Sequence, residues 1–198
     1  MEIRHSTEKD FERIMELYEH ARLFMAEHGN PGQWGPTQWP PGQLIHDDIL
    51  YKTSYVCIHA NMIIGTFFFL AGDILTNEKI FQFPHSTCRI IGQHAVCGKE
   101  NLIVSEYNIE PTYQQIENGK WIGNNAYGVV HRLAGDSSVK GIGKFCLDWA
   151  YQQCGHLRVD THGDNIIMQN LLKKIGFTYC GTIYVATDNS PRLAYEKL

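Results

Sequence analysis

The segment of this chain best suited to binding an anion reads Ser138-Val139-Lys140-Gly141-Ile142-Gly143-Lys144. It lies between an apolar run at residues 127–134 and an amphipathic run at residues 143–153, which predicts a strand, a loop and a helix. Glycines let backbone N–H groups approach an anion, a helix N-terminus adds about half a positive charge, and Lys140 and Lys144 add formal charge. The segment predicts a pyrophosphate cradle; the alternative is a plain connection whose glycines serve packing.

Candidate proton-transfer groups lie on two expected strands. Alternation along residues 127–134 places His131 and Leu133 on one face, and residues 157–161 end in a polar stretch that contains Asp160 and is followed by His162. An imidazole titrates near neutrality, which suits a general base. The alternatives are a satisfied, partly buried His131, and a polar strand end that orders the next helix.

Aromatic side chains gather in two other places. Trp34 lies in the proline- and glycine-rich residues 30–43, and Tyr113 and Trp121 precede the strand at 127–134. Such rings pack an apolar body or attract a cation. Together with His162 they are the predicted substrate-binding residues; alternatively, the rings close the ends of the sheet.

A pattern of two histidines and two cysteines could in principle hold zinc. His85 and Cys88, then His94 and Cys97, form HxxC twice with five residues between the pairs. The short spacing and the ten histidines of the chain make a chance arrangement the better interpretation. We expect no metal.

Composition indicates one packed domain. The 198 residues are 43% hydrophobic and 19% charged with a net charge of −4, which disfavours both disorder and a nucleic-acid surface. The longest apolar run, around residues 63–70, is too short to span a membrane, and the N-terminus lacks the apolar stretch of a secretory signal. Six scattered cysteines without a CxxC are typical of reduced thiols. We therefore expect a cytoplasmic protein that binds neither nucleic acid nor membrane.

Strands and helices alternate in the second half of the chain, which predicts an α/β fold with a mixed sheet. A single domain is expected over residues 1–198, with a probable insertion at 73–108. Helices are expected at residues 7–25, 44–50, 143–153 and 166–175. Strands are expected at residues 1–4, 55–59, 62–70, 127–134, 157–161, 178–184 and 193–197, and strand-like pieces at 80–83, 88–91 and 102–107.

Two segments together resemble the GNAT superfamily of acyl-CoA-dependent N-acyltransferases. The family's loop [QR]xxGx[GA] corresponds to Ser138–Gly143, and its later helix NxxAxxLYxxxGF corresponds to the segment from Asn165 to Phe177. The order of elements also agrees, apart from residues 73–108. The resemblance implies a mixed, mostly antiparallel sheet whose central parallel strands splay apart and are flanked by helices.

The same resemblance implies an acetyltransferase that moves an acetyl group from acetyl-CoA to an amine by direct attack. The pantetheine arm would pair with the strand around residues 131–133, where a backbone N–H polarises the thioester carbonyl. The implied cofactor-binding residues are Leu133, Ser138, Val139, Lys140, Gly141, Ile142, Gly143, Lys144 and Asn165. The implied catalytic residues are His131, as base, and Asp160 in reserve.

Two departures from the family pattern affect the expected chemistry. Ser138 replaces the usual Gln or Arg, and Leu172 stands where many members carry a tyrosine that protonates the leaving thiolate. They motivate a rival hypothesis, a non-catalytic CoA-binding or regulatory module. If the protein is an enzyme, the expected acceptor is a small-molecule amine rather than a protein or peptide amine. A homodimer is a further possibility.

Overall fold

The computed structural model describes residues 1–71, 80–83, 86–91, 94–97, 100–103, 110–185 and 189–198, with backbone alone for the strands between 80 and 103. Seven strands form one sheet in the order β1-β2-β3-β8-β9-β11-β10, in which only β8 and β9 run parallel. These strands are β1 (Glu2–His5), β2 (Ser54–His59), β3 (Met62–Ala71), β8 (Gly128–Gly135), β9 (Leu157–Thr161), β10 (Thr178–Tyr184) and β11 (Pro191–Lys197).

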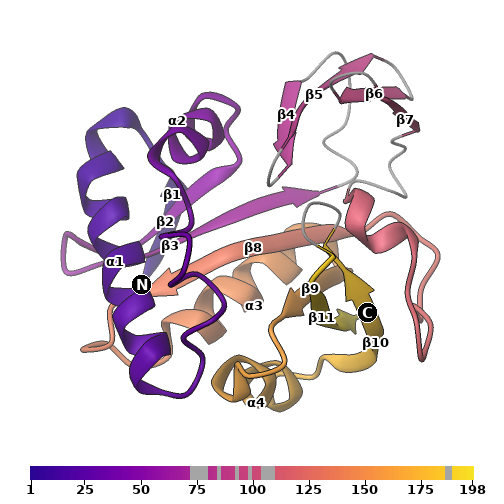
Figure 1. Cartoon of the computed structure of the whole chain (residues 1–198). Helices are drawn as coiled ribbons and strands as arrows, with labels where there is room; N and C mark the ends of the chain where they lie inside the picture. Colours follow the sequence, from indigo (N-terminus) through magenta and orange to yellow (C-terminus); the bar gives the residue numbers. More distant parts are fainter. Residues whose placement is uncertain (72–79, 84–85, 92–93, 98–99, 104–109, 186–188) are drawn as a thin grey trace.

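Helices cover both faces of this sheet (Figure 1). They are α1 (Phe11–Glu27), α2 (Gly42–Leu50), α3 (Ile142–Cys154) and α4 (Ile166–Lys174), with short 3-10 helices η1 (Glu8–Asp10) and η3 (Pro111–Gln114). One apolar cluster joins the sheet to α1 and α2 through Ile14, Ile45 and Val56. A second joins it to α3 and α4 through Cys146 and Leu172. The predicted α/β class with flanking helices is therefore confirmed.

The central strands separate after a short parallel contact. The register between β8 and β9 holds only Gly128 opposite Leu157 and Val129 opposite Arg158, whereas β8 continues to Gly135. On their outer sides β8 pairs with β3 and β9 pairs with β11. The edge of β8 beyond Val129 thus has no neighbouring strand among the described residues, and the predicted splay is confirmed.

A β-bulge interrupts β8 within the splayed part. Ala134 lies opposite Thr66 and His131 opposite Phe68, so Phe67 faces two residues of β8, and Arg132 has a φ of 52°. Leu133 consequently packs with the cluster on the α3 side, while the His131 ring lies 5.8 Å from that of Phe68. The expectation that His131 and Leu133 share a face was wrong, because the extra residue shifts the alternation.

The N-terminus of α3 is held against the sheet by a close contact. A Cβ on Gly65 of β3 would lie 2.7 Å from Ile142 Cγ2 and 3.2 Å from the Ala134 carbonyl oxygen, so only glycine fits there. Gly141, the N-cap, has a φ of 87°, a conformation that glycine adopts at no steric cost. These glycines place the first turn of α3 at the end of β8.

Four further strands form a separate antiparallel sheet within residues 80–103. They are β4 (Ile80–Phe83), β5 (Ser86–Ile91), β6 (His94–Cys97) and β7 (Glu100–Ile103), in that order. The sheet falls inside the segment expected to be an insertion. Of the zinc pattern, His85 lies outside the described residues. No helix in the described part of the chain is long and apolar enough to cross a membrane.

A buried ion network fixes the segment that leads into β8. Glu196 of β11 has no exposed surface and accepts hydrogen bonds from His156 Nε2 at 2.7 Å and Arg158 Nε at 2.9 Å. It also accepts from the backbone N–H groups of Ile122 and Gly123. The Glu196 carboxylate therefore ties the approach to β8 to strands β9 and β11.

Protonation of Glu196 is expected to destabilise the protein. Burial alone would raise its pKa, but the hydrogen bonds from His156 and Arg158 hold it at about 2, against roughly 4.3 in an unfolded chain. Because this pKa is lowered by folding, the stabilisation is complete above about pH 4.3 and is lost as the pH falls toward 2. Glu196→Gln should cost about 3–5 kcal/mol at pH 7, since it leaves buried cations uncompensated.

Chemical denaturation of wild type and Glu196→Gln between pH 7 and pH 3 measures this effect. The free energy of unfolding should fall more steeply with acid in the wild type than in the variant. Glu19→Gln, on the exposed surface of α1, is the matched control and should behave as the wild type. Equal slopes in wild type and Glu196→Gln would contradict this assignment.

Candidate functional site

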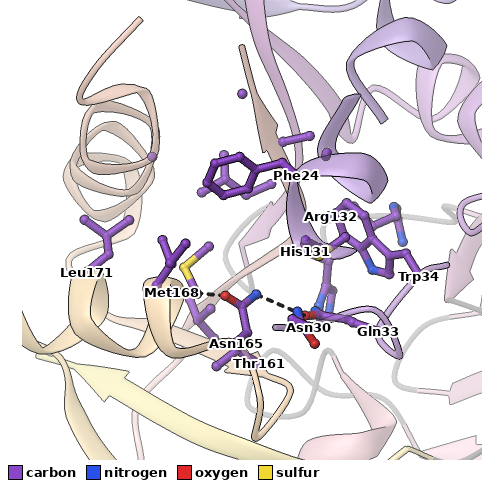
Figure 2. A pocket seen from close by; sticks show the side chains of 18 of the residues that line it. Phe24, Asn30, Gln33, Trp34, His131, Arg132, Thr161, Asn165, Met168 and Leu171 are labelled. Carbon is purple, nitrogen blue, oxygen red and sulfur yellow. Dashed lines mark hydrogen bonds between the residues drawn. The ribbon is translucent and has the colours of Figure 1, made fainter. Parts of the chain in front are cut away.

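A cavity of about 840 Å³ opens over the splay between β8 and β9. Its walls come from the C-terminal half of α1, the loop at residues 28–39, strand β8, the loop before α3, the end of β9 and the first turns of α4. Figure 2 shows part of this lining, with Leu171 and Met168 of α4 across from Trp34 and His131. The separation of the strands therefore produces a space that residues far apart in the sequence share.

The glycine loop forms one end of the cavity. Val139, Lys140, Gly141, Ile142 and Gly143 line it, and the first backbone N–H groups of a helix have no partner within that helix. The helix end and Lys140 make this part of the cavity electropositive. It has the chemistry of an anion site.

Asp136 orders the beginning of that loop. Its carboxylate accepts hydrogen bonds from Ser138 N at 3.0 Å and Ser138 Oγ at 2.7 Å, and pairs with Arg13 of α1 at 3.1 Å. Ser138 therefore turns its side chain toward the loop itself. Lys144 pairs with Asp148 on the exposed side of α3. Of the predicted cofactor-binding residues, the structure does not place Ser138 and Lys144 on the cavity wall.

An amide bridge closes the cavity between α4 and the loop at residues 28–39. Asn165 caps α4 by accepting from Met168 N at 3.1 Å, and its Nδ2 donates to Gln33 Oε1 at 3.0 Å (Figure 2). Asn30 Nδ2 donates to the same Gln33 oxygen at 2.7 Å. The predicted residue Asn165 thus lies at the cavity, as does Leu133.

The other end of the cavity holds an imidazole between two carboxylates. His131 Nε2 lies 2.9 Å from Glu110 Oε2, and His131 Nδ1 lies 3.6 Å from Asp160 Oδ1. Tyr113 donates its hydroxyl hydrogen to Asp160 Oδ1 at 2.7 Å. The side chains of Glu110, Asp160 and His131 are 5%, 15% and 14% exposed, so this cluster is largely shielded from water.

Electrostatics set the donor and acceptor roles in this cluster. Burial would raise the pKa of Glu110, but the hydrogen bond and charge of His131, with the Thr112 N–H, hold it below its usual value. Burial, and then the charges of Asp160 and Glu110, raise the pKa of Tyr113 well above its usual value, so it stays a donor. Because Glu110 is a carboxylate and can only accept, Nε2 of His131 carries the hydrogen. Nδ1 of a neutral His131 then has a free lone pair.

Arg132, the residue at the bulge, is buried in a different interaction. Its guanidinium pairs with Asp48 of α2 at 2.5 Å and lies 4.7 Å from the centre of the Phe68 ring. Both side chains of the pair are 3% exposed. The pair anchors the bulge to α2 and leaves His131 beside Glu110.

The predicted substrate-binding residues occupy different positions. Trp34 lines the cavity, whereas Tyr113 is 2% exposed and lies behind Asp160. Trp121 donates its Nε1–H to the Tyr113 carbonyl at 2.9 Å and covers Arg158. His162 accepts from Asp164 N at the start of the turn before α4. Tyr113 and Trp121 thus support the site from behind rather than form its wall.

Leu172 has no contact with the cavity. It is fully buried in the cluster that joins α3, α4 and the sheet, whereas its neighbour Leu171 lines the cavity. Among the described lining residues there is no tyrosine. The structure thus offers no phenol in place of the tyrosine that many family members carry.

Sequence reasoning found no reason to pair Glu110 with His131, and it missed Gln33. Glu110 lies before Pro111 and accepts from Thr112 N as the N-cap of η3, which is a recognisable capping signal. That signal predicts a cap and nothing about His131, which is 21 residues away. For Gln33, the loop sequence carries no signal that we recognise.

The sequence matches no protein-family model and no curated protein. Among solved structures, an acetyltransferase of the GNAT family from Streptococcus agalactiae has a TM-score of 0.73 and 27% identity, with 100% of this chain and 94% of that chain covered. One from Listeria monocytogenes has a TM-score of 0.58 and 14% identity, covering 99% and 93%. A ribosomal-protein-alanine N-acetyltransferase from Brucella melitensis has a TM-score of 0.54 and 14% identity, covering 100% and 99%.

The last two resemblances concern the fold, and the first extends to the sequence. This chain therefore has the GNAT fold, and its structural neighbours over the full length are GNAT family acetyltransferases.

Proposed function

We propose that this protein is an N-acetyltransferase that moves an acetyl group from acetyl-CoA to an amine. The observation that carries the proposal is one cavity with an electropositive helix end at one side and His131 between two carboxylates at the other. The first end suits a pyrophosphate and the second suits an ammonium group. A transfer between two bound molecules needs both, within one enclosed space.

The loop Val139–Gly143 would hold the pyrophosphate, and the free edge of β8 would pair with the pantetheine amides. Acetyl-CoA supplies an acyl group activated as a thioester. The bulge at Arg132 leaves one residue of β8 outside the ladder with β3, and we assign the N–H that polarises the thioester carbonyl to this stretch, around Leu133.

His131 would remove the proton that prevents attack. An alkyl ammonium has a pKa of about 10.4, so at pH 7 most of the acceptor is protonated. Nδ1 of His131 takes one proton, the nitrogen lone pair attacks the carbonyl carbon, the carbon–sulfur bond breaks, and the thiolate leaves with the electron pair. The acylated nitrogen then releases its second proton, which the thiolate takes through water. Asp160, 3.6 Å from Nδ1, would hold the ammonium group in place before the transfer.

Negative charge at Gly141 should weaken CoA binding. A Cβ there meets nothing within 4 Å, so Gly141→Asp adds charge and the strain of a positive φ without a clash. Calorimetry should give a dissociation constant for CoA at least about tenfold higher. Gly141→Asn carries similar backbone strain without the charge, so it should lose less affinity for CoA than Gly141→Asp.

The other end of α3 provides a matched control. Gly155, the C-cap, also has a positive φ and open space around its Cβ, so Gly155→Asp tests strain and charge away from the cavity. Its CoA affinity should equal that of the wild type. Unchanged affinity in Gly141→Asp would exclude the loop as the pyrophosphate site.

Removal of the imidazole should abolish most turnover. His131→Ala is expected to lower kcat by about 10²–10⁴-fold with nearly unchanged CoA affinity, because general bases contribute this much. The groups that face His131 are Glu110, Asp160 and Tyr113, and the acidic limb of the pH–rate profile should disappear with the ring. Wild-type turnover and an unchanged profile would exclude His131 and leave Asp160 or water as the base.

Glu110 acts as a positioning residue in this scheme. In Glu110→Gln the new amide can donate to Nε2, which moves the hydrogen of His131 to Nδ1 and blocks the base. We expect kcat to fall by about tenfold or more, with ¹⁵N NMR of the imidazole reporting the changed tautomer. Glu117→Gln, exposed on the same segment, is the control. An unchanged tautomer with normal turnover would refute this role.

A non-catalytic CoA-binding module remains the rival hypothesis, motivated by the buried Leu172 and by Ser138, which is turned away from the cavity. Thiol release in the presence of a panel of amines distinguishes the two. An enzyme releases CoA in proportion to the acylated amine, whereas a sensor binds CoA and releases none.

A further inference from the structure

We propose that the acceptor is a small primary amine at the end of an aromatic arm, with no carboxylate beside the nitrogen. This inference rests on the proposed function and names the substrate class for the same site. It follows from the walls of the cavity that holds His131, from the charges around that residue, and from the positions of the nearby cations.

Part of the wall of the cavity that holds His131 is apolar and aromatic. Phe24 of α1 and Trp34 of the following loop line it (Figure 2), together with Met25 of α1. The Trp34 ring is 8% exposed and is held edge-on by Tyr18 at 5.8 Å. The Phe24 ring is stacked on His28 at 3.9 Å. Rings fixed in this way favour a flat apolar arm over a flexible polar one.

The reacting end of the cavity carries negative charge. Glu110 and Asp160 contribute two carboxylates, and His131 is neutral in the state that accepts a proton. An ammonium group is attracted here. A carboxylate on the carbon that bears the nitrogen would be brought to within a few ångströms of Asp160 and repelled. The site therefore discriminates against α-amino acids.

The nearest cation on β8 cannot offset this repulsion. Arg132 is buried, and its charge is already neutralised by Asp48 at 2.5 Å. Lys140 lines the cavity in the glycine loop, at the end assigned to the phosphates. Arg192 lines it from the start of β11, two residues before Ala194, which is the partner of Asp160. That spacing places the Arg192 backbone about 7 Å along the strand from the position opposite Asp160. The Arg192 guanidinium donates to the Pro191 carbonyl at 3.2 Å.

Four acceptors of matched structure test the proposal. They are 2-phenylethylamine, L-phenylalanine, L-phenylalaninamide and a phenylalanyl peptide, each with saturating acetyl-CoA and a thiol-release assay. We expect kcat/KM for 2-phenylethylamine to exceed that for phenylalanine at least tenfold. Phenylalaninamide, which keeps the branch and removes the charge, should recover much of the loss.

Variants of α1 separate recognition of the arm from general damage. Phe24→Ala should raise KM for 2-phenylethylamine several-fold and leave KM for propylamine, which has no ring, nearly unchanged. Leu23→Ala is the matched control, because Leu23 is the adjacent residue and is 58% exposed. Equal effects of Phe24→Ala on both amines would overturn the assignment of the aromatic wall.

The outcomes distinguish this inference from the proposed function. Phenylalanine turned over as well as 2-phenylethylamine, with that activity lost in Arg192→Leu, would overturn the inference and assign carboxylate recognition to Arg192. Turnover of only the peptide, or of only the amines that have no ring, would also overturn this inference. Either result would still support the proposed acetyltransferase function. Thiol release with other primary amines but with none of the four acceptors would overturn this inference alone. No thiol release with any amine of the wider panel would contradict the proposed function as well.

Discussion

The separation of β8 from β9 is the constraint on which the rest of the site depends. Two parallel register pairs hold the strands together at their beginnings, and each strand is fixed on its outer side by an antiparallel neighbour. The gap is therefore built into the sheet and does not require a ligand to open it. It exposes backbone of β8 that would otherwise be paired, and it directs His131 and Asp160 toward a common space.

The opposite electrostatic character of the two ends follows from this geometry. The parallel strand β8 must be followed by a helix that crosses back over the sheet, so the positive end of α3 lies where β8 ends. At the other end, Glu110 precedes η3 and Asp160 lies on β9. The buried Glu196 ties β9 to the segment at Ile122 and Gly123 that leads into β8. The positions of the α3 N-terminus and of Asp160 thus follow from the strand order.

Much of the fold could be predicted from the sequence because the strands and helices have clear periodicity. The limits of β9 agree with the prediction, and α3 differs by one residue at each end. The loop that opens α3 was also predictable, because glycines and a following helix are local signals. Glu110 as the partner of His131 was not, since their contact depends on how η3 packs against β8. The bulge at Arg132 was equally hidden, because a non-glycine residue with a positive φ leaves no pattern in the sequence.

Because Leu172 is buried in the core, its position provides no proton donor for the thiolate half of the proposed reaction. A thiol has a pKa of about 8.5, which is about 1.5 units above pH 7. Forming the thiolate from the thiol at pH 7 therefore costs roughly 2 kcal/mol. An alkyl ammonium has a pKa near 10.4, which is about 3.4 units above pH 7. Forming the neutral amine at pH 7 therefore costs roughly 4.6 kcal/mol. Removing the proton from the amine is thus the more costly step. In the proposed reaction, the polar groups Glu110, Asp160 and Tyr113 around His131 would serve that step, whereas Leu172 lies in the core.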